Sequence, residues 1–381
     1  MTLYLSNKEK LKLLKNQKFI ISKKNLLYYL NDIEKITLEN INNLNIYNKY
    51  TSINIDKCVQ SPSWQLGHIC DFYLKNTLSL LKIKNNLKYN ILTSYIKQIE
   101  EESNIKFEEF YDSIKTLYKL RFTKKIILNR LQIVYHSIIK IIKFYINKYK
   151  LDSIDNYLIM LSILHNDMHN ENYNFTLYYF KNKMEKNILS NIKNIRGFIL
   201  ENPFINIAAG FLQQGQDINE NKLVFDNETP SFLVKIEEFK VSKYPITEYQ
   251  FLEFVLDNGY NNIEYWSNKG LEWKKQNNIN NPLYWVNINN LWYRKHINCI
   301  YKVGSNLPIC NISWYEADAY CKWKNVRFIT ESEWEYIATN LGRNTYPWGD
   351  TEPTNELCNI NNKYNYCVDV NLYKSGENEC E

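Results

Sequence analysis

The sequence predicts a protein of two domains, an all-α bundle of four helices followed by an α+β domain. A chain of 381 residues is long enough to form two separate hydrophobic cores. Up to about residue 195, apolar residues recur at three- and four-residue intervals, with almost no Gly or Pro inside the periodic segments. Beyond that point Gly, Pro and Trp become frequent and the apolar runs shorten. We therefore expect one domain at residues 1–195 and a second at residues 196–381.

The first half carries the helical pattern in five segments. These are Asn25–Ile41, Ser63–Leu81, Asn90–Glu102, Lys125–Tyr149 and Asp152–Phe180. Long helices joined by short polar connections favour an antiparallel four-helix bundle, here with an additional N-terminal helix. Bundles of this kind can hold metal ions with side chains that project inward from facing helices.

The second half contains shorter elements with clear boundary signals. Gly210–Gly215, followed by Phe225–Pro230, has the pattern of a strand, a loop and a turn, and Phe232–Val241 alternates like a strand. Three short helices are predicted, at Thr247–Asn258, Trp314–Asn325 and Glu331–Asn340. Thr247 is the expected N-cap of the first, and Thr330 with Glu333 forms the capping box of the third.

The aromatic and sulfur-containing residues of this half are expected to pack inside it. The expected core tryptophans are Trp314, Trp323, Trp334 and Trp348, and the expected buried thiols are Cys310 and Cys321.

Charge and cysteine usage exclude several classes of protein. The net charge of +6 is mild and Lys and Glu are interspersed, so a nucleic-acid-binding surface is not expected. The segment Met1–Phe19 alternates Lys with Leu, which matches neither a signal peptide nor a membrane span. The eight cysteines include no Cys-x-x-Cys pair, which favours reduced thiols in a cytoplasmic protein.

One pair of histidines has the spacing of a metal site. His165 and His169 are four residues apart, so a helix places both imidazoles on one face, about one turn apart. The spacing alone is explained equally well by two ordinary bundle histidines. Asp167 and Glu171 each lie two residues from a histidine and should point away from that face. The best third ligand is His68, although on its own it is better explained as a buried, hydrogen-bonded histidine.

Several motifs, in a fixed order, match a known family. The helical half contains Ser61–His68 (Ser-Pro-Ser-Trp-Gln-Leu-Gly-His) and His165-x-x-x-His169-x-Glu171, and the second half contains Ile312–Trp323 and Arg327–Glu335. With these motifs the sequence resembles the non-haem iron sulfoxide synthases of ergothioneine- and ovothiol-type biosynthesis. Members join a DinB-like helical bundle to a domain of the formylglycine-generating-enzyme (sulfatase-modifying-factor) type, which has a C-type-lectin-like fold. The resemblance implies this fold class for both halves.

The resemblance also implies a site and a reaction. His68, His165 and His169 would bind Fe(II) and leave positions for substrates and O2. The reaction would join a cysteine-type thiol to a histidine-derived imidazole, with O2 oxidising the sulfur to a sulfoxide. Arg121 would bind a substrate carboxylate, although a salt bridge within the chain explains it as well. Met168 occupies a position where some members carry a substrate-contacting Gln, and no catalytic residue is identified.

The resemblance ends after the turn at Tyr346–Asp350. Members continue into a Gly-Asn-Val-Trp-Glu-Trp segment and further strands that this sequence lacks. We therefore expect either a fragment of a longer gene product or a domain without its C-terminal strands. Two other functions stay open, a DinB-like metal-dependent thiol transferase and a non-catalytic remnant whose lectin-like half binds a partner.

Overall fold

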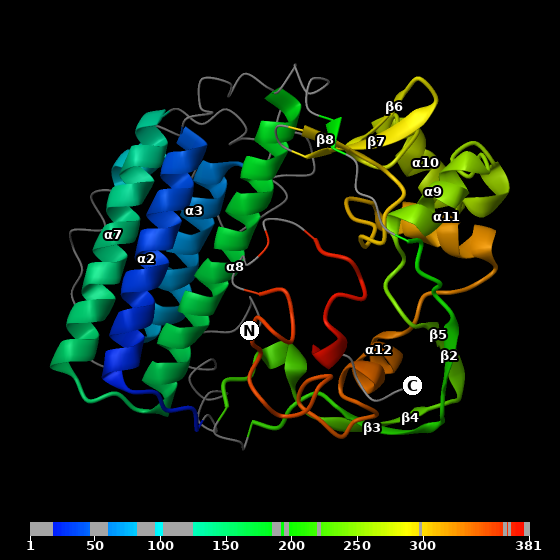
Figure 1. Ribbon diagram of the computed structural model, residues 1–381. Helices are drawn as coiled ribbons and strands as arrows, with labels where there is room; N and C mark the ends of the chain where they lie inside the picture. Colours follow the sequence, from blue (N-terminus) through cyan, green and yellow to red (C-terminus); the bar gives the residue numbers. More distant parts are fainter. Residues whose placement is uncertain are drawn as a thin grey trace. The chain divides into compact units, whose positions relative to one another are not determined.

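The computed structural model describes residues 18–45, 60–81, 96–101, 125–184, 192–193, 198–218, 222–296, 299–360, 364 and 367–376 (Figure 1). The chain divides into two compact units. The first comprises the described residues up to Met184 together with those of Gln216–Pro230, and the second comprises those of Glu185–Gly215 and Ser231–Glu381. The segment Gln216–Pro230 thus belongs to the helical unit, whereas the sequence pattern placed it after the expected division near residue 195.

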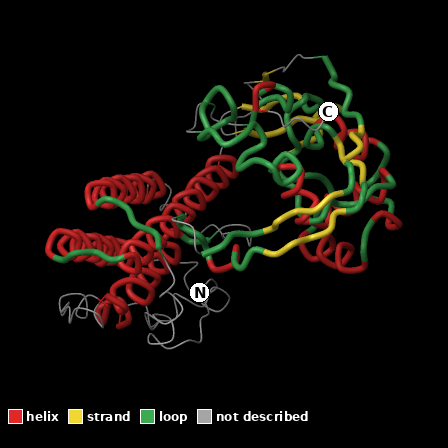
Figure 2. Tube along the Cα trace, turned by 90° about the horizontal axis from the view of Figure 1, so that it is seen from below, coloured by secondary structure: helices red, strands yellow, loops and turns green. Residues whose placement is uncertain are grey.

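Long helices form the first unit. Their bounds are Lys23–Asn45 for α2, Pro62–Phe72 for α3, Lys125–Lys148 for α7 and Ser153–Met184 for α8, with a π-helix η3 at Tyr73–Leu78. The four α-helices run side by side in two perpendicular views (Figures 1 and 2). Helix α2 packs against α7 and α8, and α3 packs against the same two helices. The prediction that the N-terminal region is helical is confirmed.

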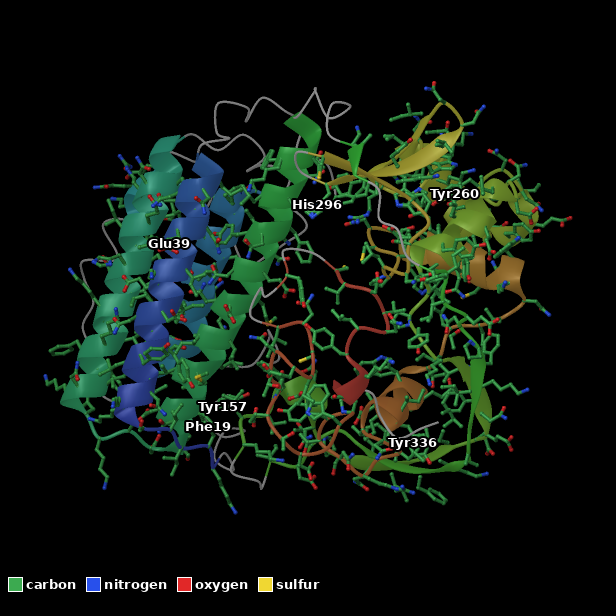
Figure 3. The ribbon with its side chains drawn as sticks, viewed as in Figure 1. Phe19, Glu39, Tyr157, Tyr260, His296 and Tyr336 are labelled. Atoms are coloured by element: carbon green, nitrogen blue, oxygen red, sulfur yellow. The ribbon has the colours of Figure 1, made fainter. Side chains whose placement is uncertain are left out.

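The apolar stripes of these helices meet in a common core. Leu30 of α2, Ile69 of α3, Ile138 of α7 and Ile159 of α8 are fully buried in one cluster. A second cluster fastens the segment Gln216–Pro230 to α8, because its Leu223 and Phe225 pack against Tyr157 and Leu158 (Tyr157 is labelled in Figure 3). None of the helices in the part of the chain described here is long and apolar enough to cross a bilayer.

Small sheets and short helices form the second unit. The strands are β1 (Ile192–Lys193), β2 (Phe204–Ile207), β3 (Gly210–Gln214), β4 (Phe232–Ile236), β5 (Phe239–Ser242), β6 (Trp285–Ile288), β7 (Leu291–His296) and β8 (Cys299–Lys302). Strand β2 pairs antiparallel with β5, and β3 pairs antiparallel with β4. The remaining strands form a sheet in the order β1-β8-β7-β6, in which only the β1–β8 pair is parallel.

The segment Phe232–Val241 is two strands, not the single strand that its alternation predicted. Strand β4 ends at Ile236 and β5 begins at Phe239, and each pairs with a different partner. The two charged residues between them, Glu237 and Glu238, are both exposed. Two adjacent solvated carboxylates interrupt the period of two, so the chain changes sheets at this point.

The predicted helices and their caps are confirmed. They are α9 (Glu248–Leu256), α11 (Trp314–Lys324) and α12 (Glu331–Ala338), and a further helix, α10 (Asn268–Asn277), was not predicted. The Thr247 hydroxyl accepts a hydrogen bond from the Gln250 amide, and the Thr330 hydroxyl accepts one from the Glu333 amide. Because the side chains satisfy backbone donors that helix starts leave unpaired, these residues fix where the helices begin.

Two hydrophobic clusters hold the second unit together. Phe251, Phe254 and Tyr260 belong to the one around α9 and α11, and Tyr336 belongs to the one beneath β3 and β4 (Tyr260 and Tyr336 are labelled in Figure 3). Only Trp323 of the four expected core tryptophans packs against a cluster.

The prediction of a core position is wrong for Trp314 and Trp334, whose side chains are each 61% exposed. Trp314 begins α11 and stacks on the half-exposed ring of Phe328, at 5.6 Å between centroids. Trp334 lines an open apolar cavity of about 930 Å³ beside α12. Aromatic character alone does not indicate on which side of a short helix a residue lies.

Candidate metal centre

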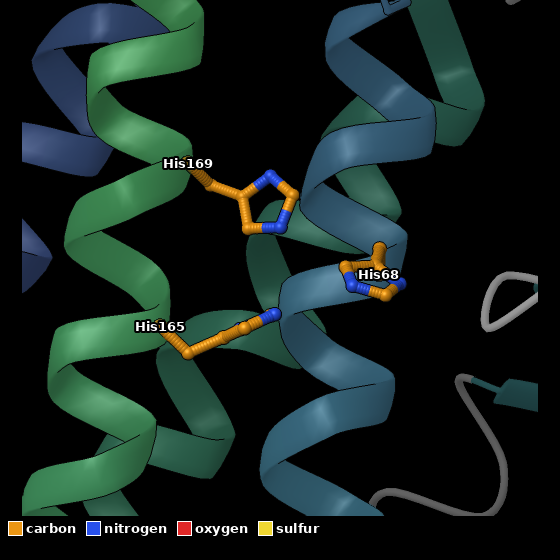
Figure 4. Close-up of side chains that lie close together, drawn as sticks. All are labelled: His68, His165 and His169. Carbon is orange, nitrogen blue, oxygen red and sulfur yellow. The ribbon is translucent and has the colours of Figure 1, made fainter. Parts of the chain in front are cut away.

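Three histidines converge between two helices of the first unit. His68 projects from α3, and His165 and His169 project from α8 on the facing side (Figure 4). The ring centroids lie 5.1 Å apart for His68 and His165, 5.0 Å for His68 and His169, and 4.8 Å for His165 and His169. One potential ligand atom from each ring lies within 4.8 Å of the other two. The structure therefore brings together the three residues that the sequence singled out.

The start of α3 is fixed by its own sequence. Ser61 is the N-cap, with its hydroxyl 3.1 Å from the Trp64 amide nitrogen, and Pro62 occupies the first helical position, where no amide hydrogen is needed. Trp64, His68 and Phe72 then follow at intervals of four residues, so they form one stripe along the helix. This stripe faces α8.

Aromatic rings pack against the histidines. The indole of Trp64 stacks on His68 with the centroids 4.9 Å apart and the planes at 14°, and lies 6.3 Å from His169. The ring of Phe72 stacks on His165 at 3.7 Å and 9°. Trp64 is only 2% exposed and also belongs to the hydrophobic core of the helical unit. The stacking of Trp64 and Phe72 on the histidines could have been inferred from the four-residue spacing of both residues from His68.

Polar contacts hold α3 and η3 against α8 on both sides of the histidines. Towards the start of α3, the Gln65 side-chain amide donates to the Thr176 hydroxyl at 3.3 Å. In η3, the Thr77 hydroxyl lies 2.6 Å from that of Ser162 and donates to the Leu158 carbonyl at 3.0 Å. Since buried hydrogen bonds are lost if the helices slide, these contacts fix the register in which His68 meets its partners.

A third buried network fixes α8 from behind. The Tyr135 hydroxyl of α7 donates to the Asn166 side-chain oxygen at 2.7 Å, and the Asn166 amide donates to the Thr37 hydroxyl of α2 at 3.0 Å. Asn166 directly follows His165 on α8, so this network anchors the backbone that carries the histidine pair. All three residues are fully buried.

Burial keeps the α8 histidines neutral. It lowers the pKa of His165 to about 2, with the neighbouring rings of His169 and His68 adding to the effect. The pKa of His169 is lowered to about 3 by burial and by His68. A neutral imidazole retains the lone pair that a metal ion requires, whereas an imidazolium has none.

Two ring nitrogens of the cluster are not hydrogen-bonded within the described part of the chain. The Nδ1 atoms of His165 and His169 are both buried and have no hydrogen-bond partner among the described residues. An unpaired buried polar atom is costly, and a bond to an ion would relieve part of that cost. Three nitrogens bound at about 2.1 Å on one side of an ion lie about 3.0–3.4 Å apart. The cluster, whose ligand atoms lie within 4.8 Å of one another, would therefore contract by up to about 2 Å around an ion.

No carboxylate joins the three rings among the described residues. Asp167 and Glu171 are both exposed on α8, as their positions relative to the histidines predicted. The arrangement thus offers three nitrogen donors on one side of an ion and leaves its other side open. Imidazole donors suit Zn, Cu, Fe and Ni, so the residues fit a redox-active metal as well as a Lewis acid.

The two expected substrate-binding residues are not part of this cluster. Arg121 lies outside the described residues. Met168 lies on α8 next to His169, but its side chain is 54% exposed. Their roles stay predictions.

Comparison with known proteins identifies the second half. Residues 200–379 match the family profile described as "Sulfatase-modifying factor enzyme 1-like domain". The chain therefore carries a domain of the formylglycine-generating-enzyme type in its C-terminal half, as the sequence motifs predicted. The match does not extend to the helical half, so the DinB-like assignment stays a prediction.

Curated relatives include oxygenases. The chain is 27% identical over 170 residues to a hercynine oxygenase of Mycobacterium tuberculosis, which covers 44% of this chain and 40% of the relative. It is 28% identical over 178 residues to a hercynine oxygenase of Mycolicibacterium smegmatis, covering 45% and 40%. It is also 28% identical over 159 residues to the inactive C-alpha-formylglycine-generating enzyme 2 of Bos taurus, covering 38% and 52%. The chain thus spans about two fifths of the length of these oxygenases.

Proposed function

We propose that this protein is an Fe(II)- and O2-dependent enzyme of the sulfoxide-synthase type. It would form a C–S bond between a cysteine-type thiol and a histidine-derived imidazole. The observation that carries the proposal is the convergence of His68, His165 and His169, with one ligand atom of each ring within 4.8 Å of the others. The similarity to hercynine oxygenases supports a histidine-derived substrate and the use of oxygen.

The site would lie in the first of two domains. Residues 1–195 would form a DinB-like four-helix bundle, and residues 196–381 would form a lectin-like domain. The side-by-side packing of α2, α3, α7 and α8 supports the first assignment. The match to the sulfatase-modifying-factor profile supports the second.

The three imidazoles would hold the iron, and their surroundings would set its environment. When bound, Fe(II) supplies the oxygen-dependent redox chemistry and open positions for the thiol and the imidazole. Trp64 and Phe72 stack on the rings of His68 and His165 and would restrict the rotation of both imidazoles. Holding two substrates side by side would make the bond-forming step effectively unimolecular.

Two further residues would contact the substrates. Arg121 would bind the carboxylate of the thiol or of the imidazole substrate through its planar guanidinium. Met168, next to His169, would make an apolar contact with the substrate. A hydrogen-bonding residue at the same position would favour a different substrate.

Anaerobic titration with Fe(II) tests the metal site. We expect the wild-type protein to bind one iron per chain, and His68→Ala, His165→Ala and His169→Ala each to weaken binding at least 100-fold. The matched control is His136→Ala, because His136 lies on α7, is exposed and pairs with Glu34. Wild-type iron binding in His68→Ala would contradict the three-histidine site.

Oxygen uptake tests the reaction. With iron, cysteine and trimethylhistidine supplied, we expect one O2 consumed for each thiol lost, together with a sulfoxide product detected by mass. Loss of thiol without oxygen uptake would instead identify a metal-dependent thiol transferase. Iron binding without either reaction would favour a chain that binds metal but does not catalyse this chemistry.

A further inference from the structure

Two cysteines of the second unit lie in contact although they are far apart in the sequence. The Sγ atoms of Cys310 and Cys367 are 3.3 Å apart, and both residues are partly accessible to solvent. A disulfide bond requires about 2.05 Å between the sulfurs, so an approach of little more than about 1 Å would join them. Cys310 was expected to be a plain buried thiol, and Cys367 had no expected role.

The backbone on both sides of this pair is held in place. The amide of Ile309 donates to the Ile246 carbonyl at 2.9 Å, which fixes the loop that carries Cys310. The amide of Val370 donates to the Asn306 carbonyl at 3.1 Å, which fixes the segment after Cys367 to the same loop. The contact between the sulfurs is therefore part of a packed region.

The two sulfurs have different electrostatic surroundings. The two sulfurs share a hydrogen bond in which either can be the donor, and this interaction, together with the nearby positive charge of Arg294, lowers the pKa of Cys367 against the effect of burial and of Glu248. The same hydrogen bond, with burial, raises the pKa of Cys310. Cys367 is thus the member of the pair that is more easily present as a thiolate.

We propose that Cys310 and Cys367 form a redox-active dithiol that reacts with a hydroperoxide to give a reversible disulfide. The Cys367 thiolate attacks the terminal peroxide oxygen, so an S–O bond forms and the O–O bond breaks with loss of hydroxide or alkoxide. The sulfur of Cys310 then attacks the Cys367 sulfenic acid, its proton leaves with the hydroxyl group as water, and the S–S bond forms. Two thiols lose two electrons, and the peroxide gains them.

The disulfide would close a loop over the whole of α11 and α12. It would covalently attach the segment after Cys367 to the loop that contains Asn306 and Cys310. Cross-links that close long loops restrict the unfolded and partly unfolded chain most strongly. Oxidation would therefore stabilise the attachment of residues 367–376, and reduction would restore the present contact.

Peptide mapping of the full chain after treatment with hydrogen peroxide tests the proposal. Trypsin combined with a Glu-specific protease separates the relevant thiols, because Glu316 lies between Cys310 and Cys321, and Lys363 lies between Cys358 and Cys367. We expect a cross-linked pair of peptides containing Cys310 and Cys367, lighter by two hydrogens and released by dithiothreitol. The control variant is Cys358→Ser, which removes another partly buried cysteine. It should still form the link between Cys310 and Cys367.

Two serine variants test the order of the steps. In Cys310→Ser the resolving thiol is absent, so dimedone should trap a sulfenic acid on Cys367 at least 10-fold more than in the wild type. In Cys367→Ser, Cys310 should stay unlabelled. In the oxidised wild type the Val370 amide should exchange its hydrogen at least 10-fold more slowly than in the reduced protein. Absence of the cross-link, or trapping on Cys310 instead of Cys367, would overturn the proposal.

Discussion

The ring of Phe72 lies flat on the imidazole of His165, with the centroids 3.7 Å apart and the planes at 9°. Phe72 is the last residue of α3, and His165 lies in the middle of α8, so the stack joins the two helices beside the three-histidine cluster. The phenyl ring fixes the plane of a side chain whose Nδ1 has no hydrogen-bond partner among the described residues.

Replacing Phe72 with Ala should weaken iron binding by about 10-fold, because the imidazole loses the contact that orients it and gains access to water. The measurement is competition with a chelator under anaerobic conditions. Phe144→Ala is the control, since Phe144 is 55% exposed on α7. Equal iron affinities of the two variants would show that the stack does not orient the ligand.

The metal-free protein should lose stability on mild acidification. The folded-state pKa values of His165 and His169 are lowered to about 2 and about 3, whereas an unfolded histidine has a pKa of about 6.5. Between these values the unfolded chain binds more protons, so the free energy of unfolding falls as the pH falls. From pH 7.5 to 5.5 the two residues together should cost about 3 kcal/mol.

Urea unfolding followed by circular dichroism, in the presence of a chelator, measures this loss. The double variant His165→Asn, His169→Asn carries no titratable group at either position and serves as the comparison. Its free energy of unfolding should depend much less on pH over this interval. Identical pH slopes for the two proteins would mean that the histidines are not kept neutral by burial.

Removing the side-chain amide of Asn166 should destabilise the helical unit. Asn166→Leu leaves the buried hydroxyls of Tyr135 and Thr37 without their shared partner, at a cost of about 2 kcal/mol. Asn147→Leu, on the exposed side of α7, should change the free energy of unfolding by less than about 0.5 kcal/mol. Urea denaturation measures both, and equal effects would show that the network contributes nothing specific.

The buried ion pair of the second unit should contribute more to the free energy of unfolding than an exposed pair does. Arg294 Nε lies 2.6 Å from Glu248 Oε1, and burial raises the pKa of Glu248 although Arg294 opposes this effect. Arg294→Met leaves that carboxyl buried without its cation, which should cost about 3 kcal/mol. Arg327→Met breaks the pair with Glu333, in which the arginine is 61% exposed, and should cost less than about 1 kcal/mol.

Thermal or urea unfolding of both arginine variants provides the comparison. If Arg294→Met were no less stable than Arg327→Met, the carboxyl of Glu248 would be tolerated in its neutral form. Burial raises the pKa of this carboxyl and so shifts its equilibrium towards the neutral form.

Local signals in the sequence predicted local structure well. The capping boxes at Thr247 and Thr330 begin helices where expected, because a hydroxyl and a carboxyl or amide three residues later satisfy backbone groups of the same turn. The four-residue spacing of His165 and His169 likewise places both rings on one face of α8. The alternation of Phe232–Val241 gave a wrong prediction of one continuous strand. A period of two cannot show that the chain changes sheets at Glu237 and Glu238.

By itself, the sequence determined where most of the described helices lie and that His165 and His169 share one face of a helix. These properties depend on the periodicity and chemistry of neighbouring residues. Only the tertiary structure decided that His68 of α3 meets the α8 pair, and that the sulfurs of Cys310 and Cys367 lie in contact. These encounters depend on how distant segments pack, through buried contacts such as those of Thr77 with Ser162 and Asn306 with Val370, and no local pattern specifies that packing.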